Sequence, residues 1–317
     1  MLANLAIVLP IFALIAVGWI ARKSGALGHT ATREISRFVL YLALPALLFE
    51  IMVTSSLDQM WQPGFILAYA LGCALVFGAT LACRAMQGKG LADAAIDGLN
   101  ASCANTGFMG FPLILTVMGS SGLAPTLIAS VLTVCVLCAI GLILIEFSMT
   151  SRAPQSGGHL QVLRRVALAL VTNPILVAPL VGCLFLFLGV ELPEPVDGFF
   201  TMLGAAASPC ALIALGLFFA EKPVPRPSGQ SWLVPALVSA KLLVHPAATW
   251  VVAGPLLGLP PPLLHTAVLL AALPTGTTPF MLTEVYHREA AITGKVVITS
   301  TIVAVFTLSG WLLLLAG

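Results

Sequence analysis

Residues 105–113 read NTGFMGFPL, and residues 272–281 read ALPTGTTPFM. Each stretch places polar, glycine and proline residues in the middle of a segment that is otherwise apolar and long enough to cross a bilayer as a helix. Glycine and proline weaken a helix, and proline also removes a backbone donor. In lipid the freed backbone groups need partners, so such breaks are tolerated only inside protein or beside a water-filled cavity. The two stretches therefore predict two broken membrane helices.

The composition around these stretches is that of a membrane protein. Of the 317 residues, 59% are hydrophobic and 8% are charged, whereas a soluble domain carries about 25% charged residues. So few charges cannot cover a surface in water, which excludes a soluble enzyme, a nucleic-acid binder and a disordered chain. An all-α integral membrane protein remains, in which each span needs ~20 mostly apolar residues.

Ten apolar segments predict ten membrane-spanning helices. Their ranges are 3–21, 35–54, 63–85, 96–118, 122–148, 166–188, 197–220, 232–254, 262–286 and 292–316. Thirteen of the fourteen Lys and Arg residues lie in alternate loops or at the span ends beside them, on the side that the positive-inside rule assigns to the cytoplasm. Both termini are then outside, and we expect a multi-pass protein of the cytoplasmic (inner) membrane. The remaining basic residue, Lys241, lies inside the eighth span.

Five spans in each half insert with opposite orientation, as in transporters that are built from inverted repeats. We expect residues 1–148 and residues 166–317 to form the two repeats, joined by a cytoplasmic loop at 149–165. The two breaks then fall in corresponding spans, the fourth and the ninth. We expect these broken helices to cross near the middle of the membrane, where the N-terminal ends of two half-helices converge.

Helix N-termini that converge in this way favour a negatively charged ligand without the help of a charged side chain. The candidate substrate-binding residues are Asn105, Thr106 and Gly107 in the first break and Thr275, Gly276 and Thr277 in the second. Thr277 or Thr278 is also expected to cap the second half of the ninth span, with Pro279 in its first turn. Two ordinary kinks are the alternative, since Pro and Gly are frequent in transmembrane helices.

Lys241 is a further candidate, because it lies about nine residues into its span, roughly 14 Å deep, where a charge is costly. It would neutralise a substrate carboxylate, act as a fixed cation in place of a bound sodium ion, or serve a structural role by snorkelling or pairing with an acid. His245, one turn later, and Asp97, near the cytoplasmic start of the fourth span, are candidates for proton coupling. A packing histidine and a favourable acid at a helix N-terminus are the alternatives. No metal or cofactor is expected, and coupling to H⁺, to Na⁺ or to neither stays open.

The motif at 105–113 resembles the N-x-G-x-x-G-x-P-L signature of the auxin efflux carrier family. The spacing from Lys241 to Pro246 is similar to that of the bacterial malonate-carrier branch of this family, and the resemblance covers essentially the whole chain. It implies an elevator fold like that of the sodium/proton antiporter NhaA and the bile-acid symporters. Spans 1, 2, 6 and 7 would form a scaffold, and spans 3–5 and 8–10 a moving transport domain. The resemblance also implies small carboxylate anions, such as malonate or auxin-like acids, as substrates, and it is compatible with a homodimer through the scaffold.

Together these observations predict a secondary active transporter of small organic-acid anions that works by alternating access. A sensor or a channel that kept the fold is the first alternative, and a membrane-embedded enzyme is the second. The sequence disfavours the enzyme, because it contains no HExxH, GxSxG or aspartate-rich motif. The identity of the anion, the direction of flux and the oligomeric state stay open.

Overall fold

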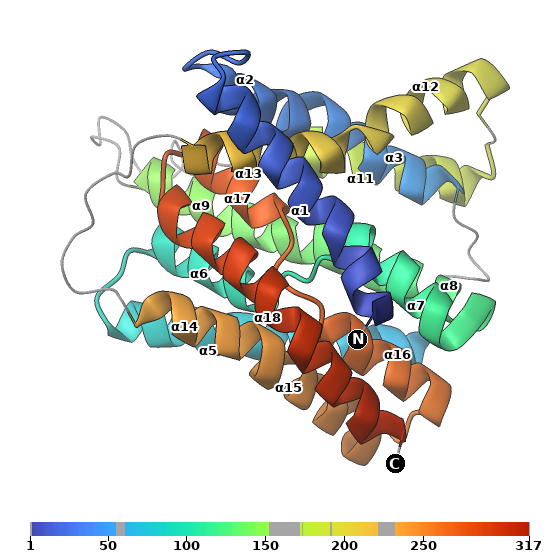
Figure 1. The fold of residues 1–317 in the computed structure, drawn as a ribbon. Helices are drawn as coiled ribbons and strands as arrows, with labels where there is room; N and C mark the ends of the chain where they lie inside the picture. The colour runs from blue at the N-terminus through green and yellow to red at the C-terminus, as the bar shows by residue number, and fades with distance from the viewer. Residues whose placement is uncertain are drawn as a thin grey trace.

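The computed structural model describes residues 2–54, 61–151, 172, 174–190, 192–220 and 232–316. Within these ranges the regular structure is helical, and the β-type pairing is limited to one isolated bridge between Ala104 and Thr275. Figure 1 shows the helices packed alongside one another, with both termini in the lower half of the view. The described residues therefore have the all-α architecture that the composition predicted.

The described residues form twenty-two helical segments. In chain order they are α1 (Leu2–Lys23), α2 (Ala31–Phe38), η1 (Val39–Ala43), α3 (Leu44–Thr54), α5 (Pro63–Met86), α6 (Leu91–Ser102), η2 (Thr106–Gly110), α7 (Phe111–Met118), η3 (Gly119–Gly122), α8 (Leu123–Ser130), η4 (Val131–Leu137), α9 (Cys138–Ser151), α11 (Pro174–Leu188), α12 (Glu194–Ala205), α13 (Ala207–Ala220), α14 (Leu233–Ser239), η5 (Ala240–Val244), α15 (His245–Val251), η6 (Val252–Leu256), α16 (Pro261–Ala271), α17 (Thr278–Val285) and α18 (Ala290–Ala316). The segment η3 is a 3₁₀-helix, and the other η segments are π-helical turns: η1, η4 and η5 lie inside longer helices, η2 begins a helix and η6 ends one. The sequence did not predict these π-helical turns, which often occur at functional sites.

Six segments of the described chain are long and apolar enough to cross a bilayer. They are Ala31–Thr54, Pro63–Met86, Leu113–Met149, Glu194–Ala220, Leu233–Leu256 and Ala290–Leu315. Two shorter apolar helices, Val177–Leu188 and Pro261–Ala271, fall in the predicted sixth and ninth spans. The chain is therefore an integral membrane protein by the length and composition of its helices, while the count of ten spans and the inverted repeat stay predictions.

Several predicted features lie outside the described residues. They are most of the connecting loop at 149–165, the first part of the sixth span, and the basic residues Arg152, Arg164, Arg165, Lys222 and Arg226. The cytoplasmic placement of the loops and the division into two repeats therefore stay predictions as well.

One group of helices is formed by α1, α2, α3, α11, α12 and α13, in the upper part of Figure 1. Here α1 packs along α13, and α3 lies against α11 and α12. The approach of α1 and α13 requires glycine on both helices. A Cβ atom on Gly18 would lie 2.1 Å from the carbonyl oxygen of Ile213, and one on Gly216 would lie 2.0 Å from that of Ile15. Small residues at such contacts let membrane helices pack closely.

A second group contains α5, α6, α9, α14, α15, α16 and α18. In this group α5 packs against α6, α6 against α9, α14 against α18, and α15 against both α5 and α16. Gly72 of α5 is needed here, because a Cβ atom would lie 2.3 Å from the hydroxyl oxygen of Thr249. Large side chains such as Phe65, Ile96 and Leu99 are fully buried between these helices.

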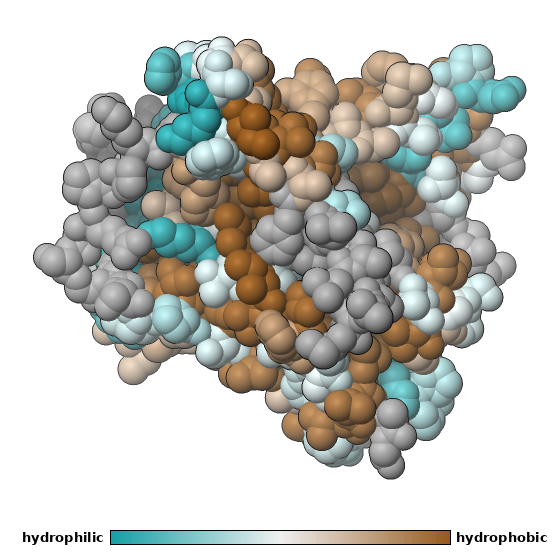
Figure 2. Space-filling view, in the orientation of Figure 1, coloured by the Kyte–Doolittle hydropathy of each residue, from teal (hydrophilic) through white to brown (hydrophobic). Residues whose placement is uncertain are grey.

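Large apolar side chains also cover much of the outer surface. Exposed examples are Leu180 and Phe187 on α11, Met202 on α12 and Phe306 on α18. In the view of Figure 2, hydrophobic residues cover wide areas, and hydrophilic residues gather around α2 and the start of α12. Helices that are apolar both on the face that packs inside the protein and on the face at its outer surface are typical of proteins in lipid. This pattern agrees with the composition.

Candidate functional site

Both predicted helix breaks are present, and they contact each other. The helix α6 ends at Ser102 and the next helical residue is Thr106, while α16 ends at Ala271 and α17 begins at Thr278. The two non-helical segments at the breaks run antiparallel to each other. The Asn105 amide donates to the Pro274 carbonyl at 2.9 Å, and the Gly276 amide donates to the Cys103 carbonyl at 2.9 Å. Each break therefore supplies backbone partners that the other lost, as a buried break in lipid requires.

Thr275 strengthens this crossing from the inside. Its hydroxyl donates to the Asn100 carbonyl at 2.8 Å, and its amide donates to the Ser300 hydroxyl at 3.1 Å. The side chain is fully buried and is not part of the pocket that lies beside the crossing. Among the predicted substrate-binding residues, Thr275 is therefore placed to hold the two breaks together.

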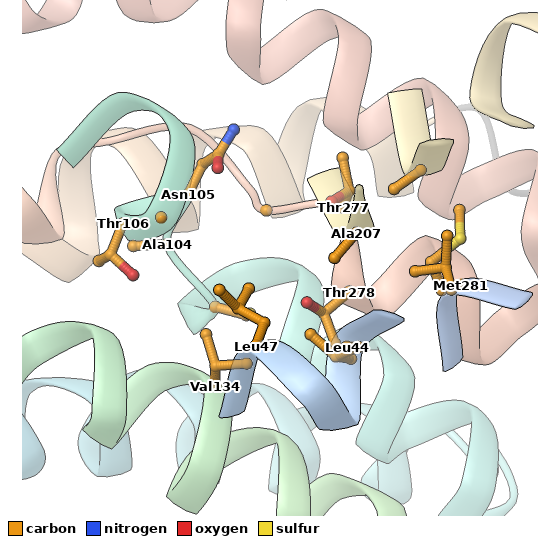
Figure 3. A pocket seen from close by; sticks show the side chains of 15 residues that line it. Leu44, Leu47, Ala104, Asn105, Thr106, Val134, Ala207, Thr277, Thr278 and Met281 are labelled. Atoms are coloured by element: carbon orange, nitrogen blue, oxygen red, sulfur yellow. The ribbon is translucent and has the colours of Figure 1, made fainter. Parts of the chain in front are cut away.

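A pocket opens beside the crossing and contains about 530 Å³ of space, counted with its open side. Its lining comes from both breaks, the first helix group with η1, η4 and the start of α17: Val39, Leu44, Leu47, Cys103, Ala104, Asn105, Thr106, Gly107, Val134, Ala207, Ala211, Gly276, Thr277, Thr278 and Met281. Figure 3 shows Asn105 and Thr106 on one side, Thr277 and Thr278 on another, and Leu44 and Leu47 below them. The pocket thus brings together five of the seven candidate substrate-binding residues, Asn105, Thr106, Gly107, Gly276 and Thr277, and their role in binding stays a prediction.

The polar wall of the pocket has unused hydrogen-bonding capacity. The Thr106 side chain is fully buried, and its hydroxyl oxygen has no hydrogen-bond partner among the described residues. Two helical segments also begin at this wall, η2 at Thr106 and α17 at Thr278. The first amides of a helix lack partners within it, although the Thr106 amide already donates to the Ala104 carbonyl at 2.9 Å. Thr277 occupies the N-cap position of α17 but makes no side-chain capping bond, so its hydroxyl is not used in the way that the sequence predicted.

The opposite wall is aliphatic and comes from α3, η1, η4 and α13. None of the fifteen described residues that line the pocket carries a charge. A negative ligand would therefore be met by hydroxyl groups, an amide side chain and helix N-termini, and an apolar part of the ligand by the leucine and valine side chains.

Lys241 lies at the C-terminal end of α16 and is not among the residues that line the pocket. Its side chain is fully buried in η5, and its ammonium donates to the carbonyl of Ala271, the last residue of α16, at 2.6 Å. The His245 Nδ1 atom is 3.1 Å from the same ammonium, and the His245 Nε2 atom is 3.4 Å from the Cys73 sulfur. A cation at a helix C-terminus is favoured by the helix dipole. Lys241 and His245 are thus brought together with each other and with the end of α16.

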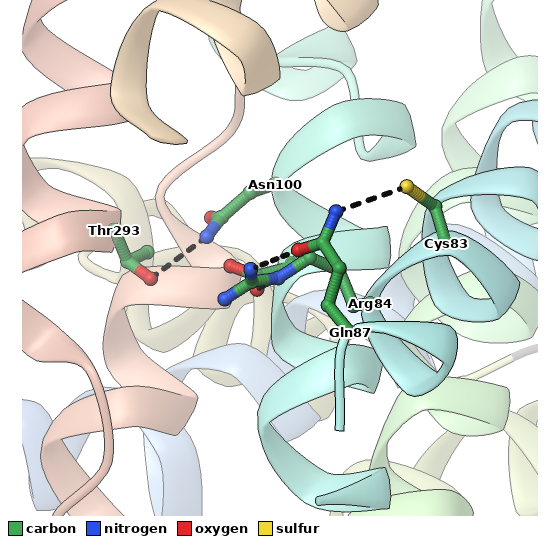
Figure 4. A network of polar contacts seen from close by, with 6 residues as sticks. Cys83, Arg84, Gln87, Asn100 and Thr293 are labelled. Carbon is green, nitrogen blue, oxygen red and sulfur yellow. Dashed lines mark hydrogen bonds and ion pairs between the residues drawn. The ribbon is translucent and has the colours of Figure 1, made fainter. Parts of the chain in front are cut away.

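Asp97 lies elsewhere, in a buried polar network between α5, α6 and α18. Its carboxylate accepts a hydrogen bond from the Arg84 Nε atom at 2.6 Å, and both side chains are almost fully buried. One turn along α6, the Asn100 amide donates to the Thr293 hydroxyl at 2.9 Å. Figure 4 shows Arg84, Gln87, Asn100 and Thr293 gathered in this network. The structure therefore does not bring Asp97 to the pocket.

Sequence reasoning missed ten of the fifteen lining residues: seven aliphatic ones, together with Thr278, Cys103 and Met281. Thr278 was expected only as a helix cap, although it stands in the same polar stretch as Thr277. Cys103 and Met281 also line the pocket, but a single cysteine or methionine in an apolar span carries no signal for such a position.

Two helix breaks that pair beside a pocket, within a bundle of long apolar helices, are the architecture of a membrane transporter. The comparison with known families agrees: residues 5–312 match the family described as "Membrane transport protein". The chain belongs to this family, which is the auxin efflux carrier family that residues 105–113 predicted.

Individual relatives are also transporters by name. A protein of Rhizobium meliloti (strain 1021) named "Putative malonate transporter" is 27% identical over 311 residues, which cover 98% of this chain and 95% of that protein. The "Uncharacterized transporter YfdV" of Escherichia coli (strain K12) is 25% identical over 221 residues, 67% of each chain. The "Auxin efflux carrier component 3a" of Oryza sativa subsp. japonica is 31% identical over 139 residues, 43% of this chain and 22% of the plant protein.

Proposed function

We propose that this protein is a secondary carrier of small organic-acid anions, and that it binds them in the pocket beside the helix crossing. The observation that carries the proposal is the polar wall of that pocket, where the buried Thr106 hydroxyl has no partner among the described residues and two helical segments begin. Unpaired donors of this kind are costly unless a ligand or water accepts their hydrogen bonds. An anion that reaches the pocket would accept them.

In this proposal the side chains of Asn105, Thr106 and Thr277 donate hydrogen bonds to the carboxylate, and Gly107 and Gly276 let the backbone come close to it. Thr275 holds the two breaks in register and acts on the substrate only through them. The aliphatic wall, with Leu44 and Leu47, takes the apolar part of the anion. The relative that is named for malonate makes this dicarboxylate the first compound to assay.

We assign Lys241 the second of the roles that the sequence left open, that of a fixed cation. Its ammonium holds the carbonyl of Ala271 at the C-terminal end of α16, which is a helix end that a bound cation would stabilise. The positive charge also makes the potential near the crossing more favourable for an anion. Direct contact with a substrate carboxylate is not part of this proposal, because Lys241 does not line the pocket.

The arrangement of the helices supports an elevator mechanism. The pocket lies between the crossing and the helices α3 and α13 of the first group. We propose that the first group is the scaffold, that the second group with the crossing moves as the transport domain, and that the substrate crosses the membrane with it. We further propose that the protein resides in the cytoplasmic membrane with both termini outside. A homodimer through the scaffold is compatible with this arrangement.

The test is flux into proteoliposomes, with radiolabelled malonate and indole-3-acetate as the probes. We expect the Asn105→Ala and Thr106→Val variants to lose about tenfold or more in kcat/KM, since a hydrogen bond to a charged group contributes about 1.5–3 kcal/mol. Thr307→Val in α18 is the matched control, because that hydroxyl donates to the Val303 carbonyl of its own helix and is not among the residues that line the pocket. Full flux by both pocket variants would contradict the proposed site.

The same preparation separates the alternatives. A carrier is stabilised by its substrate in a thermal-shift assay and moves it at carrier rates. Binding without flux would support a sensor, flux rates far above those of a carrier would support a channel, and consumption of the compound without a gradient would support an enzyme.

A further inference from the structure

The half-helices α6 and α17 have one end at the pocket and the other at a second polar site. The C-terminal end of α6 is followed by Cys103, and the N-terminal end of α17 follows Thr277; both of these residues line the pocket. With 12 and 8 residues, they extend roughly 18 Å and 12 Å away from the pocket at 1.5 Å per residue. Their far ends come together in an ionic cluster, so a change in this cluster acts on two helices that reach the pocket.

Two ion pairs tie this cluster together. Arg84 of α5 pairs with Asp97 of α6 at 2.6 Å, and Arg288, in the turn after α17, pairs with Asp93 of α6 at 2.8 Å. The first pair is almost completely buried, and about a fifth of each side chain is exposed in the second. The turn after α17 is thus attached to the start of α6 by a direct charge contact.

The cluster contains an unusual number of polar atoms without a partner. Seven buried side-chain nitrogen or oxygen atoms lack a hydrogen bond within the described residues, and five of the seven lie here: Arg84 Nη2, Asp97 Oδ1, Asn100 Oδ1, Arg288 Nε and Glu289 Oε2. Asp97 and Asn100 are fully buried. Native proteins leave few such atoms unpaired, and those that remain are usually partnered by water or a ligand. Both donors and acceptors are open here, which fits water molecules and an exchangeable proton.

Glu289 is the carboxylate of this cluster that lies between the spans, in the turn from α17 to α18. Burial, together with repulsion from Asp97 and Asp93, raises the pKa of Glu289 to about 7, although Arg84 and Lys89 act in the opposite direction. Near neutral pH this carboxyl group therefore exchanges its proton, while a solvent-exposed glutamate is ionised.

The charged groups around Glu289 come from three elements. The end of α5 and the loop after it contribute Arg84 and Lys89, and α6 contributes Asp93 and Asp97. The turn itself contributes Arg288, which Asp93 already engages. The turn has a constrained backbone, since both His287 and Glu289 have positive φ angles of 52° and 47°. Non-glycine residues rarely adopt this conformation, and it tends to persist at functional sites where the surroundings enforce it.

We propose that Glu289 is a proton-binding residue, and that its protonation state is transmitted to the pocket through α6 and α17. On protonation the carboxylate takes one proton from water and gains an O–H donor, in a cluster where the acceptors Asp97 Oδ1 and Asn100 Oδ1 are open. The cluster loses one of its three negative charges while its three positive charges remain. The repulsion within the group of carboxylates falls, so the attachment of the turn to α6 changes with pH. The proton site stands on this cluster whether or not the protein is a carrier, and only its role in coupling rests on the proposed carrier function.

The first experiment measures the proton site without any substrate. Purified wild-type protein, Glu289→Gln and the control Glu194→Gln, at the exposed start of α12, are melted in detergent between pH 4.5 and pH 8. A carboxyl group whose pKa is higher in the folded than in the unfolded state stabilises the fold at low pH, and this stabilisation disappears as the pH rises through the folded value. We expect the wild type and Glu194→Gln to lose stability toward pH 7, and Glu289→Gln to lack this component, a difference on the order of 2 °C. Identical pH profiles for all three proteins would overturn the proposal.

The second experiment measures coupling in proteoliposomes, with malonate as the probe and a pH-sensitive dye inside the vesicles. We expect malonate-driven proton movement and a pH-dependent rate in the wild type and in Glu194→Gln, and loss of both in Glu289→Gln with residual malonate flux. Unchanged pH dependence in Glu289→Gln would overturn the coupling role. If no carboxylate is transported by the wild type while the melting profiles differ as expected, the carrier function fails and the proton site stands.

Discussion

Arg84 and Lys241 are two cationic side chains that are buried in the same group of helices, yet their partners are of different kinds. Arg84 has a carboxylate, Asp97, at 2.6 Å, and the Trp232 ring centre lies 5.8 Å from its guanidinium carbon. Lys241 pairs with no carboxylate among the described residues, and its ammonium is held by the Ala271 carbonyl at 2.6 Å and the His245 ring at 3.1 Å. One charge is neutralised, and the other is balanced only by dipoles.

This difference separates a structural charge from a functional one. A buried ion pair costs much free energy of desolvation, and removing one partner leaves the other charge uncompensated. Removing a single buried cation leaves no opposite charge without a partner. The substitution relieves the desolvation cost of the cation, and it also removes a favourable contact at a helix end. We therefore expect substitutions of Arg84 to act mainly on stability and substitutions of Lys241 mainly on transport.

The largest effect on stability is expected for Arg84→Met. The substitution leaves the fully buried Asp97 carboxylate without its partner, which costs about 3–5 kcal/mol in the free energy of unfolding. Reversible unfolding in mixed detergent micelles, followed by tryptophan fluorescence, measures this loss. The double variant Arg84→Met/Asp97→Leu is the matched control and should recover most of it, since replacing a buried ion pair by apolar groups is often neutral. A double variant as unstable as the single one would show that the pair is not the reason.

Lys241→Met is expected to change stability less and transport more. The loss of the bond to Ala271 and the relief of desolvation oppose each other, so we expect a stability change within about 2 kcal/mol. Malonate flux should fall about tenfold or more, because the end of α16 and the potential at the crossing both lose a fixed positive charge. Lys23→Met, at the exposed end of α1, is the control for removing one cation. Wild-type flux by Lys241→Met would end the distinction between the two cations.

The sequence predicted the crossing well, because the signal there is local. Pro274 and Pro279 with Gly276 interrupt one apolar segment, residues 105–113 interrupt another, and a break in lipid needs a partner. The antiparallel contact of the two breaks and most of the polar wall of the pocket follow from that requirement. The π-helical turns in the spans were missed, since they arise from how neighbouring helices pack and leave no mark in an apolar sequence.

The surroundings of the two cations were predicted less well, because they depend on contacts between spans. Arg84 counts among the loop-side charges in the positive-inside pattern, yet in the structure it turns inward to Asp97, thirteen residues later. Lys241 was expected in the middle of a span, and the structure buries its side chain completely, but its contact with the end of α16 depends on the rotation of η5. Glu289 has no sequence signal at all, since its burial comes from a turn with positive φ angles that packs against α6.

The smallest effect is expected for His245→Asn, which tests whether Lys241 acts alone. If the Ala271 carbonyl is the main partner of the ammonium, removing the imidazole at 3.1 Å costs only one neutral contact, about 1 kcal/mol of stability, and malonate flux stays within about fivefold of the wild type. Thr249→Val is the control for disturbing this turn without touching the lysine, because the Thr249 hydroxyl donates to the His245 carbonyl at 2.9 Å.

The measurements are the same micelle unfolding and proteoliposome flux, and they include the double variant Lys241→Met/His245→Asn. A double variant no worse than either single one, with His245→Asn as damaging as Lys241→Met, would mean that lysine and histidine work as one unit. The unpaired cation would then be a dyad, and the contrast with Arg84 would lie in the kind of partner rather than in its absence.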